Sequence, residues 1–504
     1  MRPWRDHLEP DDPLVADGGP GPSGLTGAGT LLRVWADRWT AEPTARLWHH
    51  AGRWWTAGEF DEATRRAAGR LRGAGLEAGQ RVVWSTESSV DALVAHVGAL
   101  RAGLVVVPAN TAYSARELAH IVTDVRASAA VVERPEQADW VRKAARGPIV
   151  VTGPALDLPD ADPGPLDRSG PDDPALICFT SGTTGAPKGA VLRHRNLLAG
   201  TESVTRAWRM TPEDRLVHCL PIFHAHGLVV GAYGTMAAGG SAVLLAGFSP
   251  DAVADAASEH RASLFFGVPT MYHRLVASGR AGDLAPLRLC VSGSAPLPPG
   301  LHAAATAAIG SVVLERYGMT ETLMNTSNPY AGERRAGTVG FALPGVEVAF
   351  DDAGVVLLRG PNVFDGYFGR EAATAEAFRD LGDGGGPWFA TGDLGSDDDG
   401  YLVIRGRTTE LIISGGFNVY PTEVEDVLSG CPGVAEVAVT GTPSDEWGET
   451  VTAWVVPDGT APSLDDLRAH CAGTLAPYKQ PRLVRVVDAL PRNALGKVVR
   501  SQLG

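Results

Sequence analysis

The strongest constraint on the fold is the stretch of residues 174–194, which reads Pro-Ala-Leu-Ile-Cys-Phe-Thr-Ser-Gly-Thr-Thr-Gly-Ala-Pro-Lys-Gly-Ala-Val-Leu-Arg-His. Its apolar run, residues 175–179, has the length of a buried strand and is followed at once by hydroxyl residues, glycines and Lys188. The glycines allow a sharp turn that brings backbone N–H groups to an anion, and Lys188 adds a positive charge. The stretch therefore predicts a strand that leads into a phosphate-binding loop.

The loop is not the P-loop of nucleoside triphosphatases, because Ala186 and Pro187 separate the last glycine from Lys188. Its composition is also typical of a flexible turn that carries no chemistry. The loop alone leaves both interpretations open.

Length and composition indicate a globular protein of two or more domains, since 504 residues exceed one ordinary core. Hydrophobic residues make up 44% of the chain and charged residues 20%, which excludes a disordered protein. The formal net charge of −14 argues against nucleic acid as a partner.

The cysteines favour a reducing compartment. They are scattered, odd in number and never spaced as Cys-x-x-Cys, so neither a disulfide framework nor a zinc site is predicted: Cys178, Cys219, Cys290, Cys431 and Cys471. Residues 1–28 resemble a loose leader without an apolar segment, and no apolar run reaches membrane-spanning length. We expect a cytoplasmic protein with no membrane partner.

Helical and strand patterns alternate through most of the chain, which predicts an α/β fold. Helical spacing covers residues 31–39, 59–74, 90–101 and 115–125, and strand-like runs cover 45–49, 53–56, 81–85, 104–108, 129–131, 215–221, 241–245, 263–269, 287–293 and 311–317. We expect parallel or mixed sheets flanked by helices, then a β-rich subdomain over residues 346–404. The last hundred residues, with a helix from Pro421 and strands at 434–440 and 450–456, predict a small α+β domain.

Four further stretches combine small residues with phosphate-binding or carboxylate side chains. Residues 291–297 and 315–322 follow strand patterns, whereas 390–395 and 491–497 are predicted as loops. Tyr317 is suited to stacking on a purine, Asp393 to accepting from ribose hydroxyls and Glu321 to holding Mg²⁺. Each has an ordinary alternative: Asp393 could cap a turn, and Lys497 could be a solvated lysine.

In this order and at these separations, the five stretches resemble the adenylate-forming superfamily of acyl-CoA synthetases, peptide-synthetase adenylation domains and luciferases. The resemblance covers nearly the whole chain and is most specific in the pairing of Thr180-Ser-Gly-Thr-Thr-Gly-Ala-Pro-Lys-Gly with Tyr317-Gly-Met-Thr-Glu-Thr. Within the superfamily, residues 220–228, 265–275 and 315–330 resemble the malonyl-CoA synthetases.

The resemblance implies an N-terminal domain of residues 1–404 that binds ATP and an acid, a hinge at 405–410 with Thr409 as its turning point, and a mobile C-terminal domain at 411–504. It implies ATP, Mg²⁺ and coenzyme A as cofactors and a small carboxylic acid as substrate. Lys497, Thr184, Glu321 and His224 would be catalytic, with Thr184 and Glu321 holding the metal. A structural or metal-binding role for His224 is the alternative, although no third ligand lies near its His-Ala-His spacing.

The remaining site residues also follow from the resemblance. ATP and AMP would be bound by Thr180, Ser181, Gly182, Thr183, Thr184, Gly185, Lys188, Gly293, Ser294, Ala295, Glu315, Arg316, Tyr317, Gly318, Thr320, Asp393 and Arg407. The acyl pocket would contain His224, Ser292, Gly318, Met319, Met324, Ala303 and Ala304, and CoA would contact Gly415, Gly416 and Phe417. The stretch before Pro421 is equally typical of a tight turn ahead of a helix.

The sequence departs from its relatives at two sites. Malonyl-CoA synthetases hold the distal carboxylate with an arginine that aligns near Ala303 and Ala304, so malonate is not the expected substrate, although His302, Arg274 or Arg280 could replace that arginine. Thr409 replaces the frequent hinge lysine or aspartate, and Ile413 replaces a lysine. These changes could alter the balance between two half-reactions.

The sequence therefore predicts an AMP-forming acid–CoA ligase. One alternative is an enzyme of a single half-reaction, which either only adenylates an acid or uses an acyl-adenylate supplied by a second enzyme. Another is a nucleotide-binding relative without activity.

Overall fold

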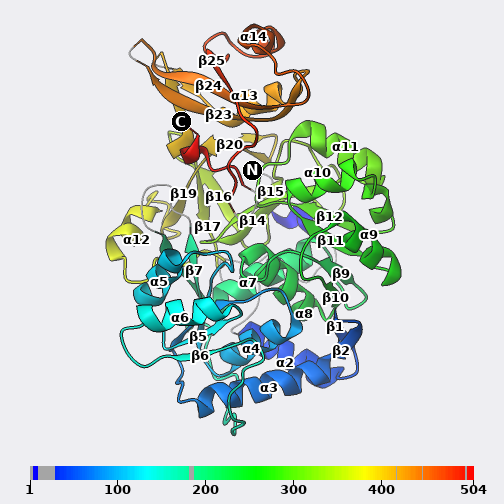
Figure 1. The fold of residues 1–504 in the computed structure, drawn as a ribbon, viewed down its shortest axis with the longest axis vertical. Helices are drawn as coiled ribbons and strands as arrows, with labels where there is room; N and C mark the ends of the chain where they lie inside the picture. Colours follow the sequence, from blue (N-terminus) through cyan, green and yellow to red (C-terminus); the bar gives the residue numbers. More distant parts are fainter. Residues whose placement is uncertain are drawn as a thin grey trace.

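The structure, a computed structural model, describes residues 4–8, 29–180, 187–415, 417–444, 446–493 and 497–503. Within these residues the strands form four sheets, two large and two small. Figure 1 shows a large lower part that contains most of the chain and a small upper part formed by its C-terminal end.

The phosphate-loop stretch lies at one edge of a six-stranded sheet. Its strand order is β6 (Val150–Thr152), β5 (Ala129–Val132), β3 (Arg81–Ser85), β4 (Val105–Pro108), β7 (Pro174–Thr180) and β8 (Lys188–Arg193). The strands are parallel except for the antiparallel pair β7–β8, whose register places Thr180 opposite Lys188. The predicted strand before the loop is confirmed, and Lys188 begins the strand that follows it.

Helices cover both faces of this sheet, as continuous apolar runs in parallel strands require. Val83, Val105 and Val107 pack in one core with α5 (Ala115–Asp124) and α6 (Pro135–Ala144), and Val82, Trp84 and Val106 pack in another with α3 (Ala57–Gly73) and α4 (Val90–Arg101). The alternation of successive valines between two cores is the period-2 pattern of a strand.

A nine-stranded sheet forms the second half of the large part. Its order is β15 (Phe341–Ala342), β14 (Leu323–Ser327), β13 (Leu314–Met319), β12 (Leu289–Ser292), β11 (Leu264–Gly267), β9 (Arg215–His218), β10 (Ser241–Leu244), β1 (Arg46–His50) and β2 (Arg53–Thr56). From β13 to β1 the strands are parallel. The predicted α/β fold is confirmed.

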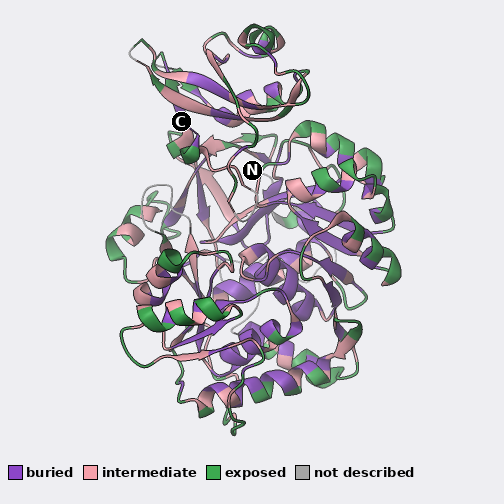
Figure 2. Cartoon of the chain, viewed as in Figure 1, coloured by how far each residue is buried: buried purple, intermediate pink, exposed green. Residues whose placement is uncertain are grey.

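Helices again line both faces of the nine-stranded sheet. One face packs against α9 (Pro250–Glu259), α10 (Pro269–Ala277), α11 (Pro299–Ile309) and the short η3 (Ala281–Leu284). The other shares the large central core with α2 (Leu31–Ala41), α7 (His194–Ala207), α8 (Gly234–Ala238) and the π-helix η2 (His226–Tyr233). Figure 2 shows buried residues gathered in the sheets and between them, with exposed residues on the outer helices.

The predicted β-rich segment is confirmed as a five-stranded sheet in which β16 (Glu347–Phe350), β17 (Val355–Arg359), β19 (Trp388–Asp398) and β18 (Phe378–Arg379) follow one another and β20 (Tyr401–Arg407) pairs with β19. The helix α12 (Glu371–Ala377) precedes β18. Because β20 continues to Arg407, the first three residues of the predicted hinge lie in a strand, and only the single turn η4 (Thr408–Glu410) follows.

The C-terminal residues form the predicted α+β unit. Its sheet contains β22 (Phe417–Val419), β21 (Ile412–Ser414), β24 (Gly448–Pro457), β23 (Val434–Ser444) and β25 (Leu483–Val486), and its helices are α13 (Pro421–Leu428), α14 (Leu464–Cys471) and the short η5 (Arg500–Gln502). A separate core that includes Ile412, Val424 and Val451 holds the sheet, α13 and α14 together. Leu503, next to η5, packs with Ala438 and Leu490 in a second, smaller core.

The N-terminal residues 4–8 pack against the large part. The expectation of a loose leader is wrong for residues 4–8, where η1 (Trp4–His7) packs the ring of His7 against Phe341 and places His7 Nε2 3.2 Å from the Phe341 carbonyl oxygen. Among the described residues, no helix combines the length and apolar character needed to cross a membrane.

Arg101 is a buried cation that joins three segments of the large part. Its side chain is 3% exposed, and its guanidinium lies 2.6 Å from Asp61 Oδ1 on α3 and 3.1 Å from Asp167 Oδ2 in the segment after β6. Removing one partner from a buried ion pair leaves the other charge uncompensated.

We predict that Arg101→Met destabilises the protein by about 3–5 kcal/mol. Arg65→Met is the matched control, because Arg65 also pairs with Asp61 but is half-exposed, and its loss should cost at most about 0.5 kcal/mol. Thermal and urea unfolding of the two variants measure the difference; equal losses would contradict the assigned role of Arg101.

Candidate active site

The loop that follows β12 is held in a strained conformation at the carboxyl end of the nine-stranded sheet. Ser294 has a φ of +70°, a left-handed value that non-glycine residues rarely adopt. Its Oγ lies 3.2 Å from His226 Nδ1, on the π-helix η2, and 3.5 Å from Arg316 Nη2, on β13. Strain of this kind is retained where surrounding contacts enforce it, commonly at functional sites.

Arg316 is a buried cation beside this loop. It is 5% exposed and lies against Gly293, where a Cβ would overlap its guanidinium. Its Nε has no hydrogen-bond partner among the described residues, and none of their carboxylates forms an ion pair with it. Burial lowers the pKa of Arg316 to about 9. A buried guanidinium in this state is suited to receive an anion.

Glu315, the residue before Arg316 on β13, contacts the loop that follows β12 from the other side. Successive side chains of a strand point to opposite faces, and Glu315 Oε1 accepts a hydrogen bond from the Leu297 N–H at 3.0 Å. Burial raises the pKa of Glu315 to about 8. The structure thus places Glu315 as a support for the 292–297 loop, behind the face on which Arg316 lies.

Tyr317, Asp393 and Arg407 form a connected group. The Tyr317 hydroxyl donates to Asp393 Oδ2, and Arg407 Nε lies 2.9 Å from Asp393 Oδ1. Asp393 and Arg407 are register partners on β19 and β20, so the sheet itself fixes the pair. The nearby Asp393 carboxylate raises the pKa of Arg407. These three predicted nucleotide-binding residues are brought together.

The prediction that residues 390–395 form a loop is wrong, because they lie within β19. Gly392, with a φ of +73°, and a register shift after Leu394 bend the strand without ending it. This bend presents the buried Asp393 from a strand, which also removes the alternative of a turn cap.

Lys497 reaches the same place from the C-terminal end of the chain, which Figure 1 shows returning to the junction between the small and the large part. Its backbone is held by Asn493, whose Oδ1 accepts from the Lys497 N–H at 3.0 Å. Burial first, and then the neighbouring Arg407 and Arg316, lower the pKa of Lys497 to about 8. Lys497 is partly buried beside these cations, which argues against the alternative of a fully solvated lysine.

His224 precedes η2 and faces this cluster. Burial, followed by the charges of Lys497 and Arg316, lowers the pKa of His224 to about 3, so its imidazole is neutral at physiological pH. Among the described residues, no three His, Cys, Asp or Glu side chains gather as a metal-binding cluster.

Four further predicted residues lie on β13 and β14 or directly after β13. Gly318 and Met324 are register partners on these strands, next to the partly buried Met319 and Thr320.

Other predicted residues lie outside this cluster. Ala303 and Ala304 are on the exposed side of α11, whereas its helical period buries His302, Ala305 and Ile309. Of the proposed replacements for the missing arginine, His302 Nε2 contacts the Val313 carbonyl at 3.0 Å and Arg280 pairs with three aspartates at the surface. The third, Arg274, is exposed and stacks over the Phe248 ring at 4.9 Å. None of the three is seen to contact the cluster, whereas the buried Arg316 lies beside it.

The remaining predictions concern the loop, the hairpin and the hinge. Ser181, Gly182, Thr183, Thr184, Gly185 and Gly416 lie outside the described residues. Gly415, with a φ of +59°, packs against Trp447, and Phe417 is 56% exposed and stacks on Tyr478 with ring centroids 4.7 Å apart. Thr409 is exposed in η4, while the neighbouring Thr408 hydroxyl donates to the Gly392 carbonyl at 3.1 Å.

Tyr367 is a residue of the site that none of the sequence motifs predicted. Its hydroxyl donates to Glu321 Oε1 at 3.0 Å, and its ring lies 5.3 Å from Lys188 Nζ. Burial raises the pKa of Glu321. The Asp-Gly-Tyr sequence that contains Tyr367 is the signal that analysis could have used.

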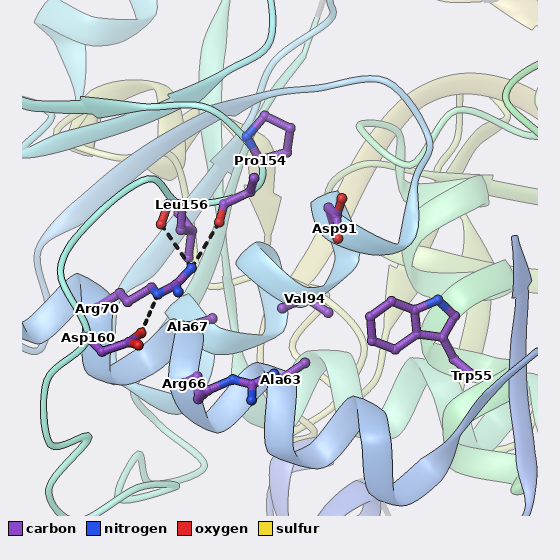
Figure 3. A pocket seen from close by; sticks show the side chains of 11 residues that line it. Trp55, Ala63, Arg66, Ala67, Arg70, Asp91, Val94, Pro154, Leu156 and Asp160 are labelled. Carbon is purple, nitrogen blue, oxygen red and sulfur yellow. Dashed lines mark hydrogen bonds and ion pairs between the residues drawn. The ribbon is translucent and has the colours of Figure 1, made fainter. Parts of the chain in front are cut away.

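A cavity of about 260 Å³ lies elsewhere, between α3, α4 and residues 154–160 (Figure 3). None of the predicted site residues lines it. Arg70 closes one side by donating to Asp160 Oδ1 at 2.7 Å and to the carbonyls of Ala155 and Leu156. These contacts fix the segment that forms the cavity wall.

The described residues thus bring together the buried Arg316, the Asp393–Arg407 pair and Lys497 from the C-terminal end of the chain. In comparison with known proteins, the AMP-binding enzyme model matches residues 32–368, and the AMP-binding enzyme C-terminal domain model matches residues 423–497. The chain therefore belongs to the AMP-binding enzyme family, and the resemblance to adenylate-forming CoA ligases is confirmed.

Its relatives have different substrates in their names. A feruloyl-CoA synthase of Amycolatopsis sp is 36% identical (92% of this chain, 96% of that protein), and a sulfoacetate–CoA ligase of Cupriavidus necator is 37% identical (85% and 88%). Two solved structures are each 40% identical. ATP-bound MatB from Rhodopseudomonas palustris has a TM-score of 0.87 (94% and 98% covered), and a malonyl-CoA ligase product complex with methylmalonyl-CoA and AMP has 0.63 (89% and 97%).

The pKa of Lys497 gives a testable pH dependence. If its ammonium stabilises charge in the ATP-dependent step, acid-dependent pyrophosphate exchange should fall as pH rises through about 8, because the charged form is lost there. Lys497→Ala should reduce exchange about 10²–10³-fold. The side chain of Lys497→Arg stays charged at alkaline pH, so any pyrophosphate exchange that this variant retains should no longer fall as the pH rises through about 8. If the exchange still falls, a group other than Lys497 causes the pH dependence.

Proposed function

We propose that this chain is an ATP-dependent acid–CoA ligase whose acid carries a second anionic group. The observation that carries the proposal is the convergence of Lys497, Arg316 and the Asp393–Arg407 pair. Lys497 and the Asp393–Arg407 pair suit adenylate formation. Arg316 remains as a buried positive charge that can bind the substrate.

In the first half-reaction, a carboxylate oxygen of the acid attacks the α-phosphorus of ATP. The new O–P bond replaces the bond to the β-phosphate oxygen, and pyrophosphate leaves. Negative charge shifts during this exchange, and the preplaced Lys497 ammonium stabilises it without reorganisation. Asp393 is placed to accept from ribose hydroxyls, and Tyr317 to lie against the purine.

The site fits Mg²⁺ through the chemistry of its donors. Mg²⁺ is usually held by one or two carboxylates together with substrate phosphates, and Glu321 offers a buried carboxylate that pairs with no cation among the described residues. Glu321, with Thr184 from the preceding loop, would hold the ion, which would neutralise charge on the phosphates. Lys188 would bind the outer phosphates beside it.

In the second half-reaction, the CoA thiol loses its proton to solvent and its sulfur forms a bond to the acyl carbon. The acyl C–O bond breaks, and AMP leaves with the oxygen it received from the acid. We propose that residues 411–504 turn about η4, which brings Gly415, Gly416 and Phe417 to the site. The TM-scores support this proposal. The two relatives are equally similar in sequence, at 40% identity, but the structure is more similar to the ATP-bound relative (0.87) than to the CoA product complex (0.63). In this arrangement, Lys497 lies near Arg407 and Arg316.

The proposed substrate class follows from Arg316. An unpaired buried guanidinium is costly, and a second anionic group on the acid would relieve that cost. The lack of an arginine at Ala303 and Ala304 thus does not deprive the pocket of a cation. Sulfoacetate belongs to this class by its chemistry, whereas ferulate and propionate do not. Malonate also carries a second carboxylate, but it is still not the expected substrate, because the arginine that holds it in malonyl-CoA synthetases has no counterpart at Ala303 and Ala304.

We predict that acids with a second anionic group are converted to CoA thioesters with higher kcat/KM than propionate or ferulate. Arg316→Met should reduce kcat/KM for those acids about 10²-fold, because their second charge loses its partner, and change it much less for propionate. Mass spectrometry of CoA thioesters measures both effects.

The same assays separate the alternatives. Preference for ferulate with no effect of Arg316→Met would contradict the substrate proposal. Exchange without thioester, or thioester only from supplied acyl-adenylate, would identify an enzyme of a single half-reaction and, in the latter case, a second enzyme as partner. ATP binding without turnover over the whole panel would favour the inactive relative.

A further inference from the structure

Residues 364–368 connect the two halves of the phosphate side of the site. Phe368 N–H donates to the Gly189 carbonyl at 2.8 Å and Val191 N–H to the Gly366 carbonyl at 3.1 Å, so the segment lies along β8, the strand that begins at Lys188. At its other end, Phe364 N–H donates to the Glu321 carbonyl at 2.8 Å. The backbone of this segment therefore fixes the spacing between Lys188 and Glu321.

The Tyr367 side chain lies between those two residues. Its hydroxyl donates to Glu321 Oε1 at 3.0 Å, and its ring centroid is 5.3 Å from Lys188 Nζ. The ring is held from the side by Phe364, with centroids 4.9 Å apart and planes at 74°, and the Tyr367 N–H donates to Thr374 Oγ1 at 2.9 Å. The tyrosine is thus anchored at its backbone, ring and hydroxyl.

This placement solves an electrostatic problem. An ammonium and a buried carboxylate on neighbouring segments would attract each other, and a direct pair would occupy the groups that phosphates and metal require. The aromatic face offers the ammonium a weaker partner, worth about 0.5–2 kcal/mol, and the hydroxyl satisfies one carboxylate oxygen while leaving the other.

We propose that Tyr367 is a positioning residue that keeps Lys188 and Glu321 apart and aligned for the magnesium–triphosphate group of ATP. The proposal rests on the proposed function, since it concerns the ATP half-reaction. Tyr367 would act through Glu321 and Lys188, which its side chain contacts. Its effect should therefore appear in Mg²⁺-dependent ATP binding and not in the reaction of a preformed acyl-adenylate with CoA, because an acyl-adenylate lacks the β- and γ-phosphates of ATP that Lys188 and Mg²⁺ would hold.

The test compares Tyr367→Phe and Tyr367→Leu with the matched control Tyr401→Phe, which loses another buried hydroxyl bond, 2.8 Å to the Glu333 carbonyl. Calorimetry measures ATP binding at several Mg²⁺ concentrations and in EDTA. We expect Tyr367→Phe to raise the Mg²⁺ concentration for half-maximal ATP binding at least threefold without changing affinity in EDTA. Tyr367→Leu should raise it tenfold or more and also alter affinity in EDTA, because Lys188 is released.

A second measurement follows thioester formation from supplied acyl-adenylate and CoA, which should stay within twofold of wild type in both variants. An Mg²⁺ dependence of Tyr367→Phe equal to that of Tyr401→Phe would overturn the proposal, as would a parallel loss of the acyl-adenylate reaction in Tyr367→Phe. If Tyr367→Leu does not fold, the phenylalanine variant decides. If the wild-type protein binds ATP with Mg²⁺ but forms no thioester, the proposed function fails and the binding measurements still decide the role of Tyr367.

Discussion

Positive charge held out of water is the constraint on which this site depends. Arg316 and Lys497 come from different parts of the chain; Arg316 is buried, Lys497 is partly buried, and the charge of Arg316 helps to lower the pKa of Lys497. Among the described residues, the electrostatic neighbours of Lys497 include two carboxylates, Asp393 and Glu410, and those of Arg316 include none. Both carboxylates are already paired, Asp393 with Arg407 and Glu410 with Arg500. Such an arrangement is favourable only with anions present, as an acid and a triphosphate would provide.

The fold brings these charges together by ending several elements at one place. β12 and β13 are neighbouring parallel strands, so their carboxyl ends deliver Ser294 and Arg316 side by side. The register of β19 and β20 adds the Asp393–Arg407 pair, and the tail adds Lys497. Because Lys497 belongs to the small part, movement of that part would remove one charge and leave the others. The number of positive charges at the site therefore depends on the position of the small part, and the chemistry that the site supports depends on those charges.

Much of this could be predicted because the relevant signals are local. The apolar run before the phosphate loop and the alternation of helices and strands depend on neighbours in the sequence, and both were confirmed. The direction of each side chain was harder to predict. The family motif places Glu315 and Arg316 together, whereas successive residues of a strand point to opposite faces. The period of α11, with His302, Ala305 and Ile309 buried, already indicates that Ala303 and Ala304 face outward. Tyr367 meets Lys188 and Glu321 only through tertiary contacts, which no local pattern contains.

The central claim is that the cations at this site direct a carboxylate oxygen onto the α-phosphorus of ATP. The most direct measurement uses an accepted acid labelled with ¹⁸O in its carboxylate, followed by mass spectrometry of the products after one turnover with CoA. The account predicts one ¹⁸O in AMP and none in pyrophosphate. Label in orthophosphate, with ADP as the other product, would show attack at the γ-phosphate and contradict it.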